Sequence, residues 1–153
     1  MSENDLGKYR LQKGDVLFNN TNSAELVGKT ALFTIDDGDY VFSNHLTRLR
    51  TRSDIVRPGW LAFYLRFLWT NRYFERAADR WIGQAAVRDD VLRSLTLPLP
   101  PADQQDVLLA RLEAQMLEVA RLCAAAERQL EAAQALPRAL LNEIFGGFEV
   151  PTE

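Results

Sequence analysis

The stretch that decides the fold runs from Leu97 to Phe148 and reads LPLPPADQQDVLLARLEAQMLEVARLCAAAERQLEAAQALPRALLNEIFGGF. Its prolines Pro98, Pro100 and Pro101 cannot lie inside a helix, whereas Asp103 can accept hydrogen bonds from the free amides of a first helical turn as an N-cap. Beyond it, apolar or small residues recur every three or four positions, which predicts a heptad seam over about four repeats. The seam residues are Leu109, Leu112, Met116, Val119, Cys123, Ala126, Leu130 and Ala133.

The length of this helix and the residues that interrupt or end it indicate that it pairs with another helix. At about 1.5 Å per residue, a helix from Asp103 to Ala135 is roughly 50 Å long. Pro137 removes a helix amide, so we expect the helix to kink or to end near Leu136. Gly146-Gly147 is expected to terminate the last amphipathic turns. Because a helix with one apolar seam is unstable alone, the pattern predicts pairing with another helix.

The residues before the helix predict a small α+β domain. Three segments have strand character, namely Val16 to Phe18, Leu26 to Ile35 and Tyr40 to Arg50. The acidic run Asp36 to Asp39 between the last two is typical of a hairpin turn. Pro58 is expected to start a helix whose aromatic residues follow at helical spacing, which indicates packing on a sheet rather than a platform for bases.

The segments that follow are shorter. Asn71 to Arg80 predicts a second helix with three arginines spaced by four, which form either a basic stripe or an ordinary solvated face. These are Arg72, Arg76 and Arg80. We expect Trp81 to Ala86 to be a glycine-containing loop, and Leu95 to Leu99 to be a last strand at a sheet edge because Pro98 cannot donate to a ladder.

Charge is spread unevenly along the chain. Residues 1–100 hold 14 Lys and Arg against 12 Asp and Glu, whereas residues 101–153 hold 4 against 9, which gives net charges of +2 and −5. Arginine accounts for 15 of the 18 basic residues, and its planar fork suits phosphate and guanine edges. Codon usage of a GC-rich genome explains that count equally well, so composition alone does not decide the partner.

Several classes of protein are excluded. One cysteine and one histidine rule out a disulfide framework and a Cys/His metal cluster within the chain. Without a membrane-length apolar run or a signal peptide, the sequence indicates a cytoplasmic protein. His45 has no obvious nucleophile partner, no phosphate-binding glycine motif occurs, and Asp36, Asp37 and Asp39 suit a turn better than a metal. We therefore expect no enzymatic activity and no cofactor.

At this point the chain resembles a known family. The runs GDVLFNNTNSAELVGKTALF, SNHLTRLR, IGQAAVRDDVLRSLTLPLPPADQQ and LLNEIFGGF, in this order, resemble the specificity (S) subunit of type I restriction–modification enzymes. The closest matches are the Pro-Leu-Pro-Pro at 98–101 with Gln105, and the Gly83-Gln84-Ala85 loop. The likeness extends from about Leu11 to Gly147.

The resemblance implies a target recognition domain followed by a conserved helix. In the family, such domains bind one half of a split DNA site, while the helices pack antiparallel, set the spacing between half-sites and dock methyltransferase (M) subunits. The S subunit does no chemistry; S-adenosylmethionine belongs to the M subunits, and ATP-driven translocation and cleavage to the R subunits. We therefore expect residues 1–97 to form a recognition domain, 98–102 a proline-rich connector and 103–148 the pairing and docking helix.

The chain departs from the family pattern in two ways. Family members usually carry two recognition domains and two helices, whereas one of each occurs here, and the segment before GDVL is short. A half-size specificity subunit that binds duplex DNA and pairs with itself or with another half is the favoured hypothesis. The alternative is an interaction module that binds M subunits without reading DNA.

Residue type and loop position select the candidate DNA contacts. Asparagine, glutamine and arginine can read base edges through two hydrogen bonds, and lysine suits phosphate. In the third predicted strand, alternation places Asn44 and three arginines on one face, which is either a solvated edge or a phosphate-contacting strip. The candidates are Asn19, Asn20, Thr21, Asn22, Ser23, Lys29, Asn44, Arg48, Arg50, Arg52 and Gln84.

Overall fold

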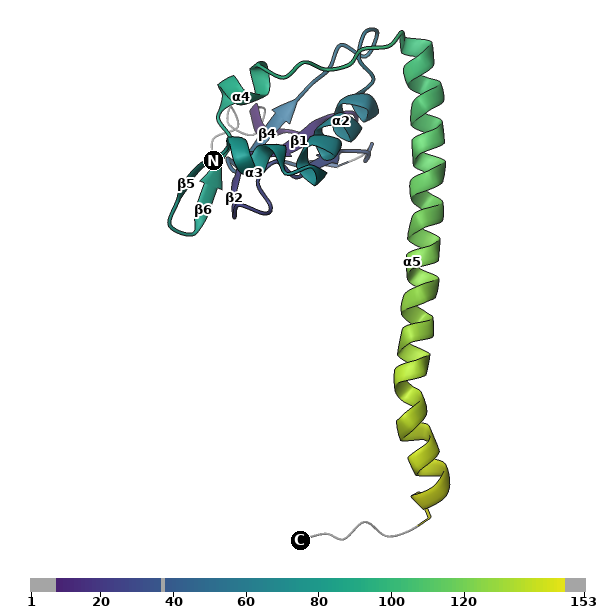
Figure 1. The fold of residues 1–153 in the computed structure, drawn as a ribbon. Helices are drawn as coiled ribbons and strands as arrows, with labels where there is room; N and C mark the ends of the chain where they lie inside the picture. Colours follow the sequence, from purple (N-terminus) through teal and green to yellow (C-terminus); the bar gives the residue numbers. More distant parts are fainter. Residues whose placement is uncertain (1–7, 37, 148–153) are drawn as a thin grey trace. The chain divides into compact units, whose positions relative to one another are not determined.

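The structure is a computed structural model that describes residues 8–36 and 38–147 (Figure 1). The chain divides into two compact units, residues 1–109 and residues 110–153, and each is described by itself. Asp37 of the expected acidic turn, the first seven residues and Phe148 lie outside the described residues.

The first unit contains two small antiparallel sheets. In one, β1 (Val16–Asn19) lies between β3 (Thr30–Leu32) and β4 (Leu46–Leu49). In the other, β6 (Gln84–Ala86) lies between β2 (Thr21–Asn22) and β5 (Asp79–Trp81). Since β1 and β2 are separated by Asn20 alone, the two sheets are joined directly through the chain.

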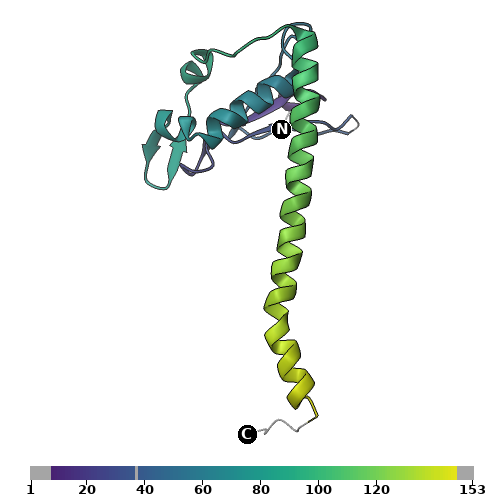
Figure 2. The same cartoon turned by 45° about the vertical axis from the view of Figure 1, so that its right-hand side comes forward.

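Among the described residues that follow β4, three helices accompany the sheets in this unit, together with the start of a fourth. They are α2 (Pro58–Thr70), α3 (Tyr73–Ala77), α4 (Asp89–Arg93) and the first residues of α5 (Ala102–Phe145). Helix α2 starts with proline, which lacks the amide that a first helical turn leaves unpaired, and it packs on β1 and β3 (Figure 2). The expected core helix at Pro58 is therefore confirmed.

The core lies where α2 and α3 meet both sheets. Val16 and Phe18 alternate inward from β1 and are fully buried, as is Leu65 of α2. The ring of Phe74 from α3 meets that of Phe18 edge to face, with centroids 4.8 Å apart. Gly28 adopts a φ of +85°, and a Cβ there would lie 2.4 Å from the Phe74 ring, so both its conformation and its neighbour require glycine.

The second and third predicted strands are wrong in extent. Residues 23–28 form a turn, because the amides of Leu26 and Val27 donate to the carbonyl of Ser23, so only Thr30–Leu32 of the second strand pairs. Of the third strand only Leu46–Leu49 forms a ladder, opposite the four residues of β1, while Val41 makes an isolated bridge with Arg10. The ladder ends where its partner ends, and alternation from Phe42 to Arg52 therefore does not hold.

Three further expectations in residues 71–99 are wrong. The second helix ends at Ala77, and Arg80 lies in β5, so the three arginines do not share a helix face. Trp81 to Ala86 is a two-stranded hairpin rather than a loop. Residues 95–99 form no strand, because the carbonyls of Thr96 and Pro98 accept hydrogen bonds from the Tyr64 hydroxyl and the Trp60 indole instead of from a ladder.

Helix α5 starts at Ala102, so Asp103 lies in its first turn and not at the cap. It runs through Pro137 to Phe145, so of the two expected alternatives, a kink or an end near Leu136, the end is excluded. Residues 133–141 are all exposed, so water can satisfy the carbonyl that a proline four residues later leaves unpaired. Gly146 and Gly147 follow the last turn, as expected.

The predicted α+β class with a long C-terminal helix is confirmed. Among the described residues, none of the helices is long and apolar enough to cross a membrane. The same residues contain no group of three or more His, Cys, Asp or Glu side chains placed to hold a metal ion.

Candidate nucleic-acid interface and pairing helix

The polar run Asn19 to Ser23 spans the end of β1 and all of β2, and its own side-chain amides hold it in place. The Asn19 side-chain amide donates to the Leu26 carbonyl at 3.1 Å, and that of Asn20 donates to the Thr47 hydroxyl at 3.0 Å. The Asn22 side-chain oxygen accepts from the Ser23 amide at 2.8 Å. These asparagines therefore shape the loop, which is a positioning task that their residue type alone did not reveal.

Three other candidates present their polar groups to solvent around this loop. Lys29 and Asn44 are exposed; the Lys29 ammonium lies 5.7 Å from the centroid of the Trp69 ring, which orients the side chain. Gln84 is exposed on β6, and its side-chain oxygen accepts a hydrogen bond from the Trp81 indole at 3.2 Å.

Register places these candidates together. Asn22 pairs with Ala85, so Ser23 and Gln84 follow next to each other, while the Asn44 carbonyl accepts from the Asn20 side chain. We call this group the loop cluster. Its members are Asn19, Asn20, Thr21, Asn22, Ser23, Lys29, Asn44 and Gln84.

The remaining candidates lie at the opposite end of β1, and we call them the arginine cluster: Arg48, Arg50 and Arg52. Because β4 is antiparallel to β1, Leu46 pairs with Asn19 whereas Leu49 pairs with Val16. The structure thus divides the predicted contacts into two groups rather than one continuous strip.

Each member of the arginine cluster already has a protein partner. Arg50 donates to both carboxylate oxygens of Asp15, at 2.5 and 3.0 Å. Arg48 donates to the Arg10 carbonyl at 2.7 Å, and Arg52 pairs with Asp54 at 3.2 Å. Only the Arg52 pair is well exposed on both sides, so Arg52 is the member that can exchange partners at least cost.

Asp15 explains why Arg50 is committed. Burial of its side chain, which is 1% exposed, would by itself raise the pKa of the carboxyl group. The Arg50 hydrogen bonds, the Gln12 amide and the charge of Arg48 outweigh burial and hold the pKa below 3.8. The Asp15 carboxylate is therefore charged and buried, and its ion pair with Arg50 is part of the folded structure. Arg50 is not free to bind another partner without leaving this carboxylate unpaired.

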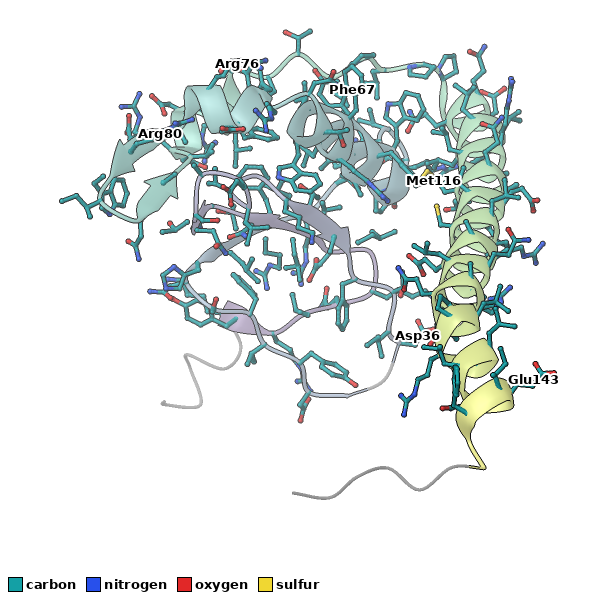
Figure 3. The ribbon with its side chains drawn as sticks, turned by 60° about the horizontal axis from the view of Figure 1, so that its bottom comes forward. Asp36, Phe67, Arg76, Arg80, Met116 and Glu143 are labelled. Carbon is teal, nitrogen blue, oxygen red and sulfur yellow. The ribbon has the colours of Figure 1, made fainter. Side chains whose placement is uncertain are left out.

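The structure adds a basic group that the helical-stripe hypothesis did not place correctly. Arg72 and Arg80 lie 3.5 and 3.6 Å from the same carboxylate, Glu75, and Arg80 also donates to the Glu75 carbonyl. Arg76 lies on α3 and Arg80 on β5, at the same end of the first unit (Figure 3). Two arginines thus flank one carboxylate that is 24% exposed, while exposed Arg76 donates to the Asn71 carbonyl at 3.0 Å.

The start of α5 is fastened by Gln105, which is fully buried. Its side-chain oxygen accepts from the Arg57 amide at 2.8 Å, and its side-chain nitrogen donates to the carbonyls of Ile55 and Pro100 at 2.9 and 2.8 Å. Arg57 also binds both carboxylate oxygens of Asp106 at 2.7 Å. One buried amide therefore joins the segment before α2, the proline-rich connector and the first turn of α5.

Beyond this anchor the predicted seam is largely open. Leu109 belongs to the first unit, where a Cβ at Gly59 would lie 3.3 Å from one of its methyl carbons. In the second unit, Val119 is 51% and Leu130 is 59% exposed, and Cys123 is a free, exposed cysteine. Met116, another of the predicted seam residues, lies on α5 and is 37% exposed (Figure 3). The helix therefore presents apolar side chains that its own unit does not cover.

A comparison with known families gives one result for most of the chain. The model described as "Type I restriction modification DNA specificity domain" matches residues 2–120.

A curated relative agrees with it. The chain is 27% identical over 151 residues to the putative type I restriction enzyme MjaX specificity subunit of Methanocaldococcus jannaschii, an alignment that covers 97% of this chain and 35% of that protein. The chain thus spans about a third of the length of the curated relative that it matches.

Solved structures share the fold. One, from work on complex assembly and conformational transition of a type I R-M system, has a TM-score of 0.73 at 22% identity, over 93% of this chain and 36% of that one. The HsdS subunit from Thermoanaerobacter tengcongensis has a TM-score of 0.61 at 22% identity, with the same coverage of both chains.

Proposed function

The chain belongs to the family of type I restriction modification DNA specificity domains, and from this we propose that it supplies DNA sequence specificity to a methyltransferase complex without catalysing a reaction itself. In this proposal the first unit binds one half-site of duplex DNA, and α5 pairs with a second helix and docks M subunits. S-adenosylmethionine and ATP bind to partner subunits. The alternative, a module that does not read DNA, is not favoured by the family.

The observation that carries the DNA-binding half of the proposal is the loop cluster. Asparagine side chains fix the junction of β1 and β2 to the turn at residues 24–28 and to β4, and Lys29, Asn44 and Gln84 stand exposed around it. A rigid loop with exposed amides can present donors and acceptors to base edges at little entropic cost. A cytoplasmic location belongs to the same proposal, because the chromosome is there.

Salt dependence tests this half directly. A plot of the logarithm of the binding constant against the logarithm of the salt concentration has a negative slope, and removing one phosphate contact makes it less steep by about one. We expect Lys29→Gln to weaken binding of the chain and its M subunit to all duplexes and to flatten this slope. Gln84→Ala should weaken binding to a target duplex, selected from a random-sequence pool by the wild-type complex, more than it weakens binding to random duplex. Lys13→Gln, at an exposed lysine paired with Asp36, is the matched control. Equal binding by all three variants and the wild type would remove the loop cluster from the interface.

The pairing half rests on the exposed seam, and we propose a second copy of the chain as the default partner. In an antiparallel two-fold pair, residue i meets residue j and j meets i. Centring the axis between Ala124 and Ala125 sets Met116 opposite Ala133, Val119 opposite Leu130, and Cys123 opposite Ala126. Each of these layers then combines a larger side chain with a smaller or similar one, which suits close packing.

The seam cysteine makes this register testable. Ala126→Cys places a second thiol opposite Cys123 of the other copy, and mild oxidation should then convert most of the protein into covalent dimers. Arg128→Cys puts the added thiol on the outer face of the same helix and should add no cross-link beyond that of the wild type. If both variants cross-link equally, the register is wrong; a monomer at all concentrations by sedimentation would instead point to pairing with a different chain.

A further inference from the structure

The β5–β6 hairpin ends in an apolar side chain that nothing in the described chain covers. Its two-residue turn is Ile82-Gly83, and Ile82 is 102% exposed, more than any other large apolar residue of the described chain. Gly83 has a φ of +76°, which lets the turn close so tightly. Next to it, Trp81 is half exposed. A side chain that is fully in water adds no burial energy to its own fold, so Ile82 is free to make an external contact.

The hairpin is firmly held at its base. Ala85 is fully buried, and Val87 joins the core through a hydrogen bond from its amide to the Asn20 carbonyl. The β6 strand pairs on its other side with β2, which belongs to the loop cluster. The tip is therefore a fixed extension of the surface that carries Thr21, Asn22 and Gln84.

Charge identifies the kind of surface that the tip would meet. Three exposed arginines lie beside the hairpin, at the N-cap of α3, on α3 and on β5, namely Arg72, Arg76 and Arg80. Arg72 and Arg80 flank Glu75 and keep 74% and 53% of their side chains exposed. Residues 72–81 hold these three arginines against the two carboxylates of Glu75 and Asp79, a surplus of one positive charge, and Asp79 is itself paired with Arg88. A rigid ribbon with an apolar tip and a cationic flank matches duplex DNA, whose major groove admits a two-stranded ribbon and displays thymine methyl groups between rows of phosphates.

We propose that the β5–β6 hairpin enters the major groove tip first, that Ile82 contacts a thymine methyl group, and that Arg76 and Arg80 bind the flanking phosphates. The proposal rests on the DNA binding proposed above and assigns it a specificity-determining residue. Ile82 then selects thymine over cytosine at one position of the target, because only thymine carries the methyl group.

A cycle that alters the protein and the DNA together tests this contact. The probe is a duplex enriched from a random-sequence pool by the full chain with its M subunit, with each thymine replaced in turn by deoxyuridine. At one position the wild type should bind about fourfold more weakly, the value of one buried methyl group. Ile82→Ser should bind the thymine duplex roughly tenfold more weakly and should be indifferent to deoxyuridine. Arg76→Gln and Arg80→Gln should each flatten the salt slope by about one.

The matched control is Ile35→Ser, at a second exposed isoleucine of the first unit, which should keep wild-type affinity and methyl dependence. Because Ile82 is fully exposed, its substitution should leave the urea midpoint unchanged. The inference is overturned if the enriched target lacks a preferred thymine, if Ile82→Ser keeps the methyl dependence, or if it weakens M-subunit binding instead. Failure of the wild-type complex to enrich any duplex would reject the DNA-binding proposal itself.

Discussion

The two units of the chain solve the problem of apolar surface in opposite ways. In the first, Phe18, Phe74 and Leu65 are fully buried, and the buried polar side chains of Asp15 and Gln105 have hydrogen-bond partners. In the second, Leu122, Leu136 and Leu140 each keep more than half of their surface exposed. A residue that is buried on folding stabilises its own unit, whereas an exposed seam stabilises only a complex. The first unit thus buries its large core residues by itself. The second unit, which we call the arm, leaves its apolar seam open to a partner.

The largest expected effect disrupts the first unit from within. Arg50→Ala leaves the buried Asp15 carboxylate unpaired, and we expect the free energy of unfolding to fall by about 3 to 5 kcal/mol. Urea titration followed by tryptophan fluorescence measures it. Arg52→Ala removes the exposed pair with Asp54 and should cost less than about 1 kcal/mol. This contrast also separates folding from DNA contact, since only a variant that folds like the wild type can report on binding.

A smaller effect should follow at the junction of the connector and α5. Gln105→Ala leaves the Arg57 amide and the carbonyls of Ile55 and Pro100 without their partner, at a cost of about 2 to 3 kcal/mol if water fills part of the space. Hydrogen exchange should accelerate at residues 102–109. Its neighbour Gln104 is exposed, and Gln104→Ala is the matched control. Unchanged exchange in both variants would mean that the buried amide does not anchor the helix.

The arm should respond to dilution rather than to changes within its own unit. Leu130→Ala removes seam surface and should weaken self-association by roughly tenfold, or about 1.4 kcal/mol. Leu117→Ala changes a leucine of similar exposure, 55% against 59%, that lies off the seam. Sedimentation at several concentrations distinguishes them. Should both variants associate alike, the proposed seam is not the pairing surface.

The smallest expected effect is the pH dependence of stability that comes from Asp15. The pKa of Asp15 is lowered in the folded state, so its contribution to stability is complete above pH 3.8 and disappears as the pH falls through the folded pKa. We expect the wild-type urea midpoint to change little between pH 7 and pH 5 from this group. In Arg50→Ala, burial acts against fewer donors and should raise the pKa of Asp15, so protonation then favours the folded state and the variant should recover part of its lost stability as the pH falls. Parallel pH profiles for both proteins would contradict this account of the pair.

Residue patterns that repeat along the chain were sufficient to predict the long helix α5 and the fold class. The spacing of apolar residues predicted α5, and Gly146-Gly147 marked its end, because helix periodicity and glycine conformation are local properties. Pro58 and the aromatic spacing behind it predicted α2 for the same reason. Pro137 left a kink or an end as alternatives, and the helix does not end there, since a proline inside a helix costs less where water reaches the freed carbonyl.

Pairing and partner choice were decided by the tertiary structure alone. The strand pattern of Tyr40 to Arg50 says nothing about the length of β1, which limits the ladder to Leu46–Leu49. Arg50 and Arg52 look alike in the sequence, yet Arg50 binds the buried carboxylate of Asp15 and Arg52 binds the exposed one of Asp54. The Arg50 partner could not be read from the sequence because Asp15 lies 35 residues away along the chain. Ile82 stood in an expected loop until β5 and β6 placed it at a fixed tip. Local periodicity thus determined the elements, whereas contacts between distant residues determined which side chains remain available for a partner.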